Sequence, residues 1–348
     1  MTNISKLNKK SNVLNDIRKN GKSNDWKGKK QMNEDYSDIL KKLHYLKAKN
    51  VSTCADTLLF TKDEKGFLEL QQTWFCKSRL CPVCAWRRSI LFSSQVSDIV
   101  SKAIDADKSG RWLFLTLTTK NTKTARELGL EIRKMNNGLR SLLKRKKVAK
   151  NLNGFMRATE VTVNKKNRTY NQHMHVLLFV KSTFFKNKDN YIKQQEWTEM
   201  WQEVMKLDYK PVVNVKAIKE DSKKGIKGAV YEVAKYPVKA IDYLNGTDIQ
   251  NRLTVDDLEK ALNRKRLTAF GGLLKKIQKE LNMQDVDDKE TDLVDIEDIK
   301  DSEEDEYKKE NEEEPKTFVV AKWNQKDKNY YTESFLATFS DMGLYDRS

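Results

Sequence analysis

The segment HMHVLLFV, residues 173–180, restricts the possible folds more than any other part of the chain. Apart from His173 and His175 it is apolar on both faces, which is typical of a strand buried at the centre of a sheet. The segment FMRATEVTV, residues 155–163, also has the pattern of a strand, and the polar stretch NKKNRTYNQ separates the two. The sequence therefore predicts a central β-hairpin.

The segments around this hairpin alternate between strand and helix patterns. RWLFLTLTT, residues 111–119, has one apolar face at every second position and predicts a strand. The next segment predicts an amphipathic helix, because apolar residues recur at three- and four-residue spacing. Thr122 or Thr124 would cap its start. The apolar positions are Leu128, Ile132, Met135, Leu139 and Leu142. Weaker patterns predict helices over 32–48, 189–206 and 226–244, a strand over 211–218, and a helix from Thr254, where Thr254 and Asp257 resemble a capping box.

His173 and His175 are two of only three histidines in the chain. Their spacing puts both side chains on one face of a strand, where each imidazole can give a nitrogen to a divalent ion. Glu160, on the preceding strand, would add a carboxylate oxygen. This set suits Mg²⁺ or Mn²⁺, and such an ion can polarise a phosphodiester. The alternative is a pair of core histidines satisfied by hydrogen bonds.

All four cysteines lie in one short window and predict a zinc site. Cys81-Pro-Val-Cys84 forms a knuckle that directs two thiolates at one ion, and the other two ligands would be Cys76, close by, and Cys54, across a hairpin formed by residues 57–75. Four unlinked buried thiols, or redox chemistry at the Cys-x-x-Cys pair, are the alternatives.

The chain is strongly basic, with a formal net charge of +17 and a pI near 9.4. This charge indicates a polyanionic partner, either nucleic acid or an anionic membrane surface. Arg79, Arg87 and Arg88 lie on or beside the cysteine knuckle, where they would contact phosphates or form a solvated basic surface.

No apolar run reaches the ~18 residues that span a bilayer, and the N-terminal segment lacks the apolar stretch of a signal peptide. We therefore expect a cytoplasmic protein without a membrane partner, in a compartment where thiols stay reduced.

The segment GAVYEVAKYPVKAIDYL contains a second group of reactive side chains. On a helix, Glu232 and Tyr236 would share one face, and Lys239 would lie beside the phenol and favour its ionised, nucleophilic form. Pro237 interferes with a continuous helix, because its ring collides with the carbonyl four residues earlier. The alternative is an amphipathic helix with ordinary surface charges.

Composition divides the chain into five expected regions. Residues 1–30 predict a basic disordered arm, 31–105 a helix with the cysteine zinc module, and 106–284 the domain that contains the histidine pair. Residues 285–316 hold 17 acidic and 5 basic side chains and predict a disordered acidic segment. Residues 317–348 predict a tail that returns to the body as a strand.

Taken together, FLTLTTKN, HMHVLLFV and YEVAKYPVK resemble, in that order, the three motifs of the HUH (His-hydrophobe-His) rolling-circle replication initiators. CKSRLCPVCAWRRS resembles the cysteine segment of the initiators of small plasmids from Gram-positive bacteria. The resemblance covers roughly residues 35–245 and rests on four motifs in the expected order.

This resemblance implies an α+β fold, in which an HUH nickase domain with a central antiparallel sheet and flanking helices follows a small zinc-ribbon-like cysteine module. It implies that His173, His175 and Glu160 hold the divalent metal and that Tyr236 attacks the scissile phosphate. Tyr236 would become linked to the 5′ end and leave a 3′-OH primer. Glu232 would promote water attack at termination, and Lys239 would position the nucleophile or stabilise developing charge.

The implied partners are plasmid origin DNA, cut at a single-stranded or extruded site, and a host helicase and polymerase. The nearest alternatives are other HUH enzymes, either a single-tyrosine transposase or a mobilisation relaxase. A relaxase of the usual kind has its tyrosine before the histidine motif, whereas Tyr236 follows it. A non-enzymatic zinc-dependent DNA-binding regulator and an RNA-binding protein are alternatives from other classes.

Overall fold

The computed structural model describes residues 12–19, 21–218, 223–234, 238–294, 296 and 314–344. The chain forms two compact units, the first from residues 1–84 and 292–348 and the second from residues 85–291. Each unit contains one five-stranded antiparallel sheet with helices, which confirms the predicted α+β class. Among the helices in the described ranges, none is long and apolar enough to cross a membrane.

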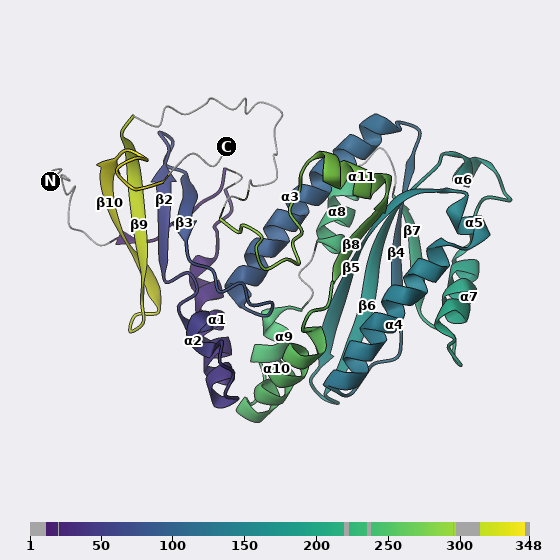
Figure 1. Ribbon diagram of the computed structural model, residues 1–348, viewed down its shortest axis with the longest axis horizontal. Helices are drawn as coiled ribbons and strands as arrows, with labels where there is room; N and C mark the ends of the chain where they lie inside the picture. Colours follow the sequence, from purple (N-terminus) through teal and green to yellow (C-terminus); the bar gives the residue numbers. More distant parts are fainter. Residues whose placement is uncertain are drawn as a thin grey trace. The chain divides into compact units, whose positions relative to one another are not determined.

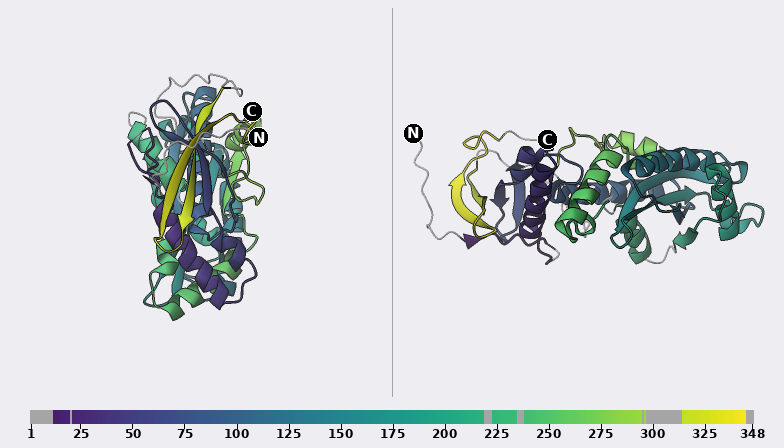
Figure 2. Two further views of the ribbon diagram at one scale, coloured as in Figure 1. Left: turned by 90° about the vertical axis from the view of Figure 1, so that its left-hand side faces the viewer. Right: turned by 90° about the horizontal axis from the view of Figure 1, so that it is seen from below.

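The sheet of the first unit joins the two ends of the chain. Its strand order is β1-β10-β9-β2-β3, with β1 (Asn12–Val13), β2 (Thr57–Lys62), β3 (Leu68–Thr73), β9 (Lys316–Asn324) and β10 (Asn329–Ala337). The predicted hairpin between the first two cysteines is β2–β3, and the C-terminal tail returns as β9–β10, which pairs with β2 (Figures 1 and 2). The cysteine module and the tail are therefore parts of one sheet.

Helices α1 (Trp26–Lys42) and α2 (Ala48–Ser52) belong to the same unit. Asp25 begins α1 by accepting a hydrogen bond from the backbone of Gly28, and Trp26 is buried, with its indole nitrogen 2.7 Å from Asp16 Oδ2. The prediction of a disordered arm over residues 1–30 is therefore wrong for residues 12–19 and 21–30, which are folded. The composition of this segment is polar, but one buried tryptophan anchors it.

The sheet of the second unit has the order β7-β4-β6-β5-β8. Its strands are β4 (Arg111–Thr118), β5 (Leu152–Asn164), β6 (Thr169–Val180), β7 (Val213–Ile218) and β8 (Thr268–Gly272). The strand β6, which carries HMHVLLFV, occupies the middle of the sheet, as its apolar composition predicts, and β5–β6 is the predicted hairpin.

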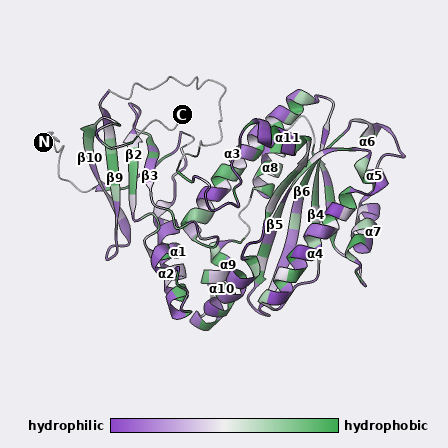
Figure 3. Cartoon of the chain, in the orientation of Figure 1, coloured by the Kyte–Doolittle hydropathy of each residue, from purple (hydrophilic) through white to green (hydrophobic). Residues whose placement is uncertain are grey.

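Helices cover both faces of this sheet. One face packs against α4 (Ala125–Leu143) and α7 (Gln194–Met205), with Leu115, Val176 and Trp201 in the shared core. The other packs against α3 (Pro82–Ala106), α8 (Lys223–Val233) and α11 (Leu273–Glu280), with Leu177 and Phe179 in the shared core. Figure 3 shows hydrophobic and hydrophilic residues alternating along α4, as expected for a helix with one buried side. The remaining helices are α5 (Lys146–Ala149), α6 (Thr183–Lys186), α9 (Ala240–Leu244) and α10 (Asp248–Leu262).

Several predicted helix boundaries are wrong. The helix predicted to begin at Thr254 is α10, which begins after Thr247; the Thr247 side chain accepts from the Gln250 backbone, and Thr254 is buried inside the helix. The helical pattern over 226–244 is split into α8 and α9. The long helix α3 was not predicted, although Phe92, Val96, Ile99 and Ala103 recur at helical spacing on its buried side.

The beginning of the acidic segment, predicted to be disordered over 285–316, is folded against the second unit. The Asp287 carboxylate accepts hydrogen bonds from the backbone nitrogens of Leu267 and Thr268 at 2.8 and 2.9 Å, and from the Thr268 hydroxyl at 2.9 Å. Asp285 forms an ion pair with Arg266 at 2.8 Å. Residues 295 and 297–313 lie outside the described ranges.

We predict that Asp287→Ala lowers the free energy of unfolding by about 1–3 kcal/mol, because it leaves two backbone donors without their acceptor. The exposed neighbour Asp288 is the matched control, and its replacement by alanine should change stability by less than about 0.5 kcal/mol. Urea unfolding followed by tryptophan fluorescence measures both, and equal effects would show that Asp287 has no special structural role.

Candidate active site

The pairing of β5 with β6 brings the three predicted metal ligands together. Glu160 lies directly opposite His173, and His175 follows two residues later on the same face. The Glu160 Oε2 atom is 3.3 Å from His173 Nε2 and 3.1 Å from His175 Nε2. The three ligand atoms all lie within 4.8 Å of one another. Three side chains predicted as ligands from sequence spacing therefore converge on one point.

This geometry fits a small divalent ion. Ligands at right angles around an octahedral ion, with bonds of about 2.1 Å, are separated by about 3.0 Å. The two separations from Glu160 Oε2, 3.3 and 3.1 Å, are close to that value. A mixed imidazole and carboxylate set is compatible with Mn²⁺ and, at a site with few protein ligands, with Mg²⁺.

Two further polar side chains orient the imidazoles. His173 Nδ1 is 3.2 Å from Asn171 Oδ1, and His175 Nδ1 is 3.4 Å from Thr116 Oγ1. The His175 ring also stacks on Phe114, with centroids 5.4 Å apart. Contacts at Nδ1 fix the ring orientation and leave Nε2 directed at the ligand position, which is the usual arrangement around metal-binding histidines.

The site is shielded but reachable. The side chains of Glu160, His173 and His175 are 9%, 15% and 11% exposed. Burial alone would raise the pKa of Glu160, but its hydrogen bonds with the two histidines outweigh burial and hold the pKa well below the ordinary value. Glu160 is therefore an ionised carboxylate at neutral pH, as a metal ligand must be.

The segment with the predicted nucleophile is only partly described. Tyr236, with Lys235 and Pro237, lies outside the described residues. Glu232 is half-buried near the end of α8, and Lys239 is exposed, with extended backbone (φ −73°, ψ 136°) just before α9. Glu232 and Lys239 thus belong to different segments, and their roles, like that of Tyr236, stay predictions.

The described residues that flank 235–237 are Val233 and Ala234 before this gap, and the residues that lead into α9 after it. Val233 and Ala234 are buried in the core on the sheet face that carries His173 and His175. In α9, the pKa of Asp242 is raised above its ordinary value, mainly because the side chain is partly buried. The positive charges of Lys239 and Lys165 lower this pKa, whereas the negative charge of Glu160 raises it. The Lys165 ammonium, on the β5–β6 turn, donates hydrogen bonds to the backbone oxygens of Ile241 and Asn245 at 3.0 and 2.7 Å.

The first unit contains the second candidate metal site. The four cysteines are free thiols whose sulfurs lie within 4.8 Å of one another. The Cys54–Cys84 sulfurs are 3.5 Å apart, and the Cys76–Cys84 and Cys54–Cys81 pairs are each 3.7 Å apart. A tetrahedral Zn²⁺ with bonds of about 2.3 Å would separate its sulfurs by about 3.8 Å. The cluster thus fits the predicted zinc site closely.

The protonation of this cluster is uneven. Burial raises the pKa of the Cys54 and Cys84 thiols well above the ordinary value. Burial acts in the same direction on Cys81, but hydrogen bonds from the other three cysteines lower its pKa well below that value. The Asn33 amide also donates to Cys81 Sγ at 3.2 Å. The amide donor at Cys81 Sγ favours the thiolate form that a metal ligand needs.

The three predicted phosphate contacts differ in exposure. Arg79 and Arg88 are half-buried, whereas Arg87 is buried and lies 5.9 Å from the centre of the Trp86 ring. DNA contacts at these arginines stay predictions.

Sequence reasoning missed Thr116, Asn171 and Asp242. Asn171 had a usable signal, because it lies two residues before His173 in the same strand and so shares its face. Thr116 and Asp242 had none, because strand pairing and chain folding alone bring them near the site.

Comparison with known proteins identifies the family. A family model described as "Replication protein" matches residues 67–331 of the chain. A protein named "Protein rep" from Lactiplantibacillus plantarum is 43% identical over 324 residues, which cover 92% of this chain and 99% of the relative. Another "Protein rep", from Streptococcus pneumoniae serotype 2 (strain D39 / NCTC 7466), is 42% identical over 334 residues, covering 95% and 99%.

The chain therefore belongs to the replication protein family, which confirms the family to which its motifs are similar. A further "Protein rep", from Bacillus amyloliquefaciens, is 40% identical over 342 residues, with 91% and 96% coverage. No solved structure gave a significant match.

We predict that Asn171→Ala weakens Mn²⁺ binding about 10- to 100-fold, because the His173 ring loses the partner that orients it. Asn167→Ala, in the exposed turn of the same hairpin, is the control and should bind Mn²⁺ like the wild type. Titration of free Mn²⁺ by electron paramagnetic resonance measures both affinities. Equal affinities for the two variants would contradict a role for Asn171 at the metal centre.

Proposed function

We propose that the protein initiates rolling-circle replication of a plasmid by nicking one DNA strand at the origin. The observation that carries this proposal is the convergence of Glu160, His173 and His175 at the centre of a covered sheet. Membership of the replication protein family supports it, as do relatives that are named Rep and match nearly the whole chain. These relatives favour an initiator over a transposase or a relaxase.

The sheet contributes by holding three ligands for one ion. When bound, a divalent ion supplies charge that polarises a phosphodiester and stabilises its developing negative charge. Glu160, His173 and His175 fix the position at which this happens, and Asn171 and Thr116 fix the imidazole rings. Because the ligand side chains are largely buried, water competes little for this position.

The nucleophile in this proposal is Tyr236. Its phenol oxygen loses its proton and bonds to the scissile phosphorus, the bond from phosphorus to the 3′ oxygen breaks, and that oxygen takes up a proton to become the 3′-OH primer. The 5′ phosphate stays on the tyrosine, which conserves the energy of the broken ester. Val233 and Ala234, before the tyrosine, pack on the ligand-bearing face, and Asp242, after it, interacts electrostatically with Glu160; both observations support this role.

Two other side chains have proposed roles in the same reaction. Lys239 would stabilise the negative charge of the phenolate. Glu232 would take a proton from the water that attacks at termination. Origin DNA is the proposed partner; its phosphates would meet the basic surface, so binding should weaken as salt rises. A host helicase and polymerase would act on the exposed 3′-OH.

The cysteine cluster fits a structural Zn²⁺, because all four positions of a tetrahedron are filled by cysteines and none is left for a substrate. In this proposal the second unit cuts the strand.

The proposal predicts that the wild-type protein relaxes supercoiled parent plasmid in Mn²⁺ or Mg²⁺ and remains attached to the 5′ end. Tyr236→Phe should bind the DNA but nick it about 10⁴-fold or more slowly, because the nucleophile is lost. Tyr231→Phe, whose parent residue is 57% exposed on α8, is the matched control and should nick normally. Agarose gels of the plasmid forms give the rates.

If the wild type binds the plasmid but never cuts it with either metal, the enzyme proposal fails and a DNA-binding regulator becomes the better account. If Tyr236→Phe and Tyr231→Phe nick equally well, the nucleophile lies elsewhere.

A further inference from the structure

The cysteine cluster depends on a turn that is unusual in its own right. Cys54 reaches the cluster from the turn between α2 and β2, far in sequence from Cys76, Cys81 and Cys84. Ala55, the next residue, has a φ of 57°, in the left-handed region. That conformation costs a residue with a Cβ atom roughly 1–2 kcal/mol, so other contacts must hold the turn.

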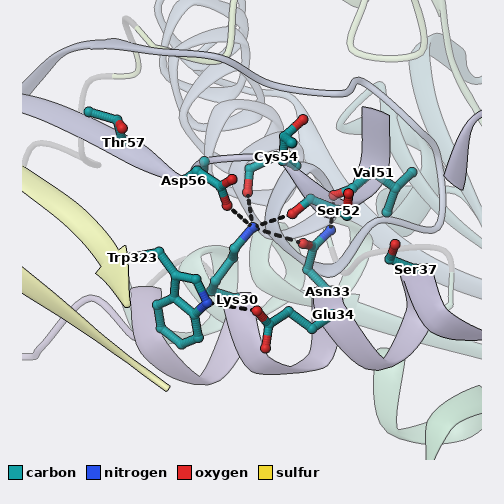
Figure 4. Close-up of polar contacts among 12 residues, drawn as sticks. Lys30, Asn33, Glu34, Ser37, Val51, Ser52, Cys54, Asp56, Thr57 and Trp323 are labelled. Carbon is teal, nitrogen blue, oxygen red and sulfur yellow. Dashed lines mark hydrogen bonds and ion pairs between the residues drawn. The ribbon is translucent and has the colours of Figure 1, made fainter. Parts of the chain in front are cut away.

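Lys30 on α1 holds this turn from one side (Figure 4). Its side chain is completely buried, and its ammonium donates to the backbone oxygens of Ser52 and Cys54 at 2.7 and 2.9 Å. It also pairs with Asp56 Oδ1 at 2.5 Å. A buried ammonium is costly unless its three donors are used, and here the turn supplies an acceptor for each.

Asn33, one turn further along α1, contacts both the turn and the cluster. Its amide nitrogen donates to the backbone oxygen of Val51 at 3.0 Å and to Cys81 Sγ at 3.2 Å. Its side-chain oxygen accepts from Lys30 at 3.3 Å. One helix therefore fixes the position of Cys54 and donates a hydrogen bond to the sulfur of Cys81.

The C-terminal hairpin β9–β10 holds the same turn through further contacts. The Tyr330 hydroxyl donates to the backbone oxygen of Ala55 at 2.6 Å. The Trp323 backbone nitrogen donates to the backbone oxygen of Asp56 at 2.8 Å. Tyr330 is 1% exposed and its ring lies 4.9 Å from that of Trp323. The hairpin is also tied to α1, because the Trp323 indole nitrogen donates to Glu34 at 2.7 Å (Figure 4).

We propose that Lys30 and Tyr330 are positioning residues for the cysteine centre, and that metal binding and docking of the β9–β10 hairpin stabilise each other. The two residues hold Cys54 where its thiolate completes a four-sulfur site. Because linkage is reciprocal, contacts that favour the metal-binding geometry raise the affinity for the ion, and the bound ion stabilises those contacts by the same free energy. This inference does not depend on DNA nicking.

The first test compares zinc affinities in the full-length protein, by competition with a chromogenic chelator. Tyr330→Phe removes one hydroxyl and keeps the ring, and it should weaken zinc binding about 10-fold. Tyr331→Phe is the matched control, because it makes the same change at the next residue, whose exposed hydroxyl hydrogen-bonds to Asp327, and its affinity should stay at the wild-type value. Lys30→Met should weaken binding further, by about 100-fold.

The second test separates positioning from general destabilisation. With Co²⁺ in place of Zn²⁺, the sulfur-to-cobalt charge-transfer absorption reports the number of thiolate ligands, and Lys30→Met should lose about a quarter of its intensity as Cys54 leaves the ion. Removal of zinc from the wild type should also speed amide hydrogen exchange in β9 and β10.

Equal zinc affinities for Tyr330→Phe and Tyr331→Phe would overturn the proposal, as would exchange in β9–β10 that chelation leaves unchanged. If Lys30→Met fails to fold, the comparison of the two tyrosine variants still decides the question. A wild-type protein that binds no zinc would also overturn it.

Discussion

The candidate active site depends on the register between β5 and β6. Glu160 lies opposite His173 because these two strands pair without a shift in this region, and Thr116 lies opposite His175 because β4 pairs on the other side. A shift of one residue would turn one partner's side chains to the opposite face and separate the carboxylate from the imidazoles. Apolar layers pack on both faces of the sheet and hold the paired strands in place.

The two candidate metal sites relate differently to their units. In the second unit, two extensive apolar layers hold the sheet, so the fold brings the ligands together by itself. In the first unit, an apolar cluster around Leu59, Phe318 and Ala337 packs on the sheet, and the cysteine site joins Cys54 to the distant Cys76, Cys81 and Cys84. In the proposed function, a metal would therefore have a chemical role in the second unit, where it polarises a phosphodiester, and a structural role in the first, where four cysteines leave no open position.

The sequence predicts best where one periodicity or one spacing dominates. Four features could be predicted in this way: the apolar run of β6, the pairing of β5 with β6, the β2–β3 hairpin, and the cysteine and histidine clusters. Lys30 could not, because a lysine in a basic, polar segment is normally solvated, and only the fold shows that it is buried. The start of α10 was missed because two threonines, Thr247 and Thr254, have acidic or amide residues three positions later, and sequence alone does not show which of them caps the helix. The structural role of Asp287, in an acidic stretch, could not be predicted either. The backbone donors that it accepts from belong to residues far away in the sequence, and only the fold brings them together.

The central claim is that the ion held by Glu160, His173 and His175 directs Tyr236 to a DNA phosphate. The most direct measurement is mass spectrometry of the adduct that forms with an oligonucleotide containing the mapped nick site. The account predicts a 5′-phosphate ester on Tyr236 that forms with Mn²⁺ in the wild type and fails to form in His175→Ala. Attachment to another residue, or equal adduct formation by His175→Ala or in the presence of a chelator, would contradict it.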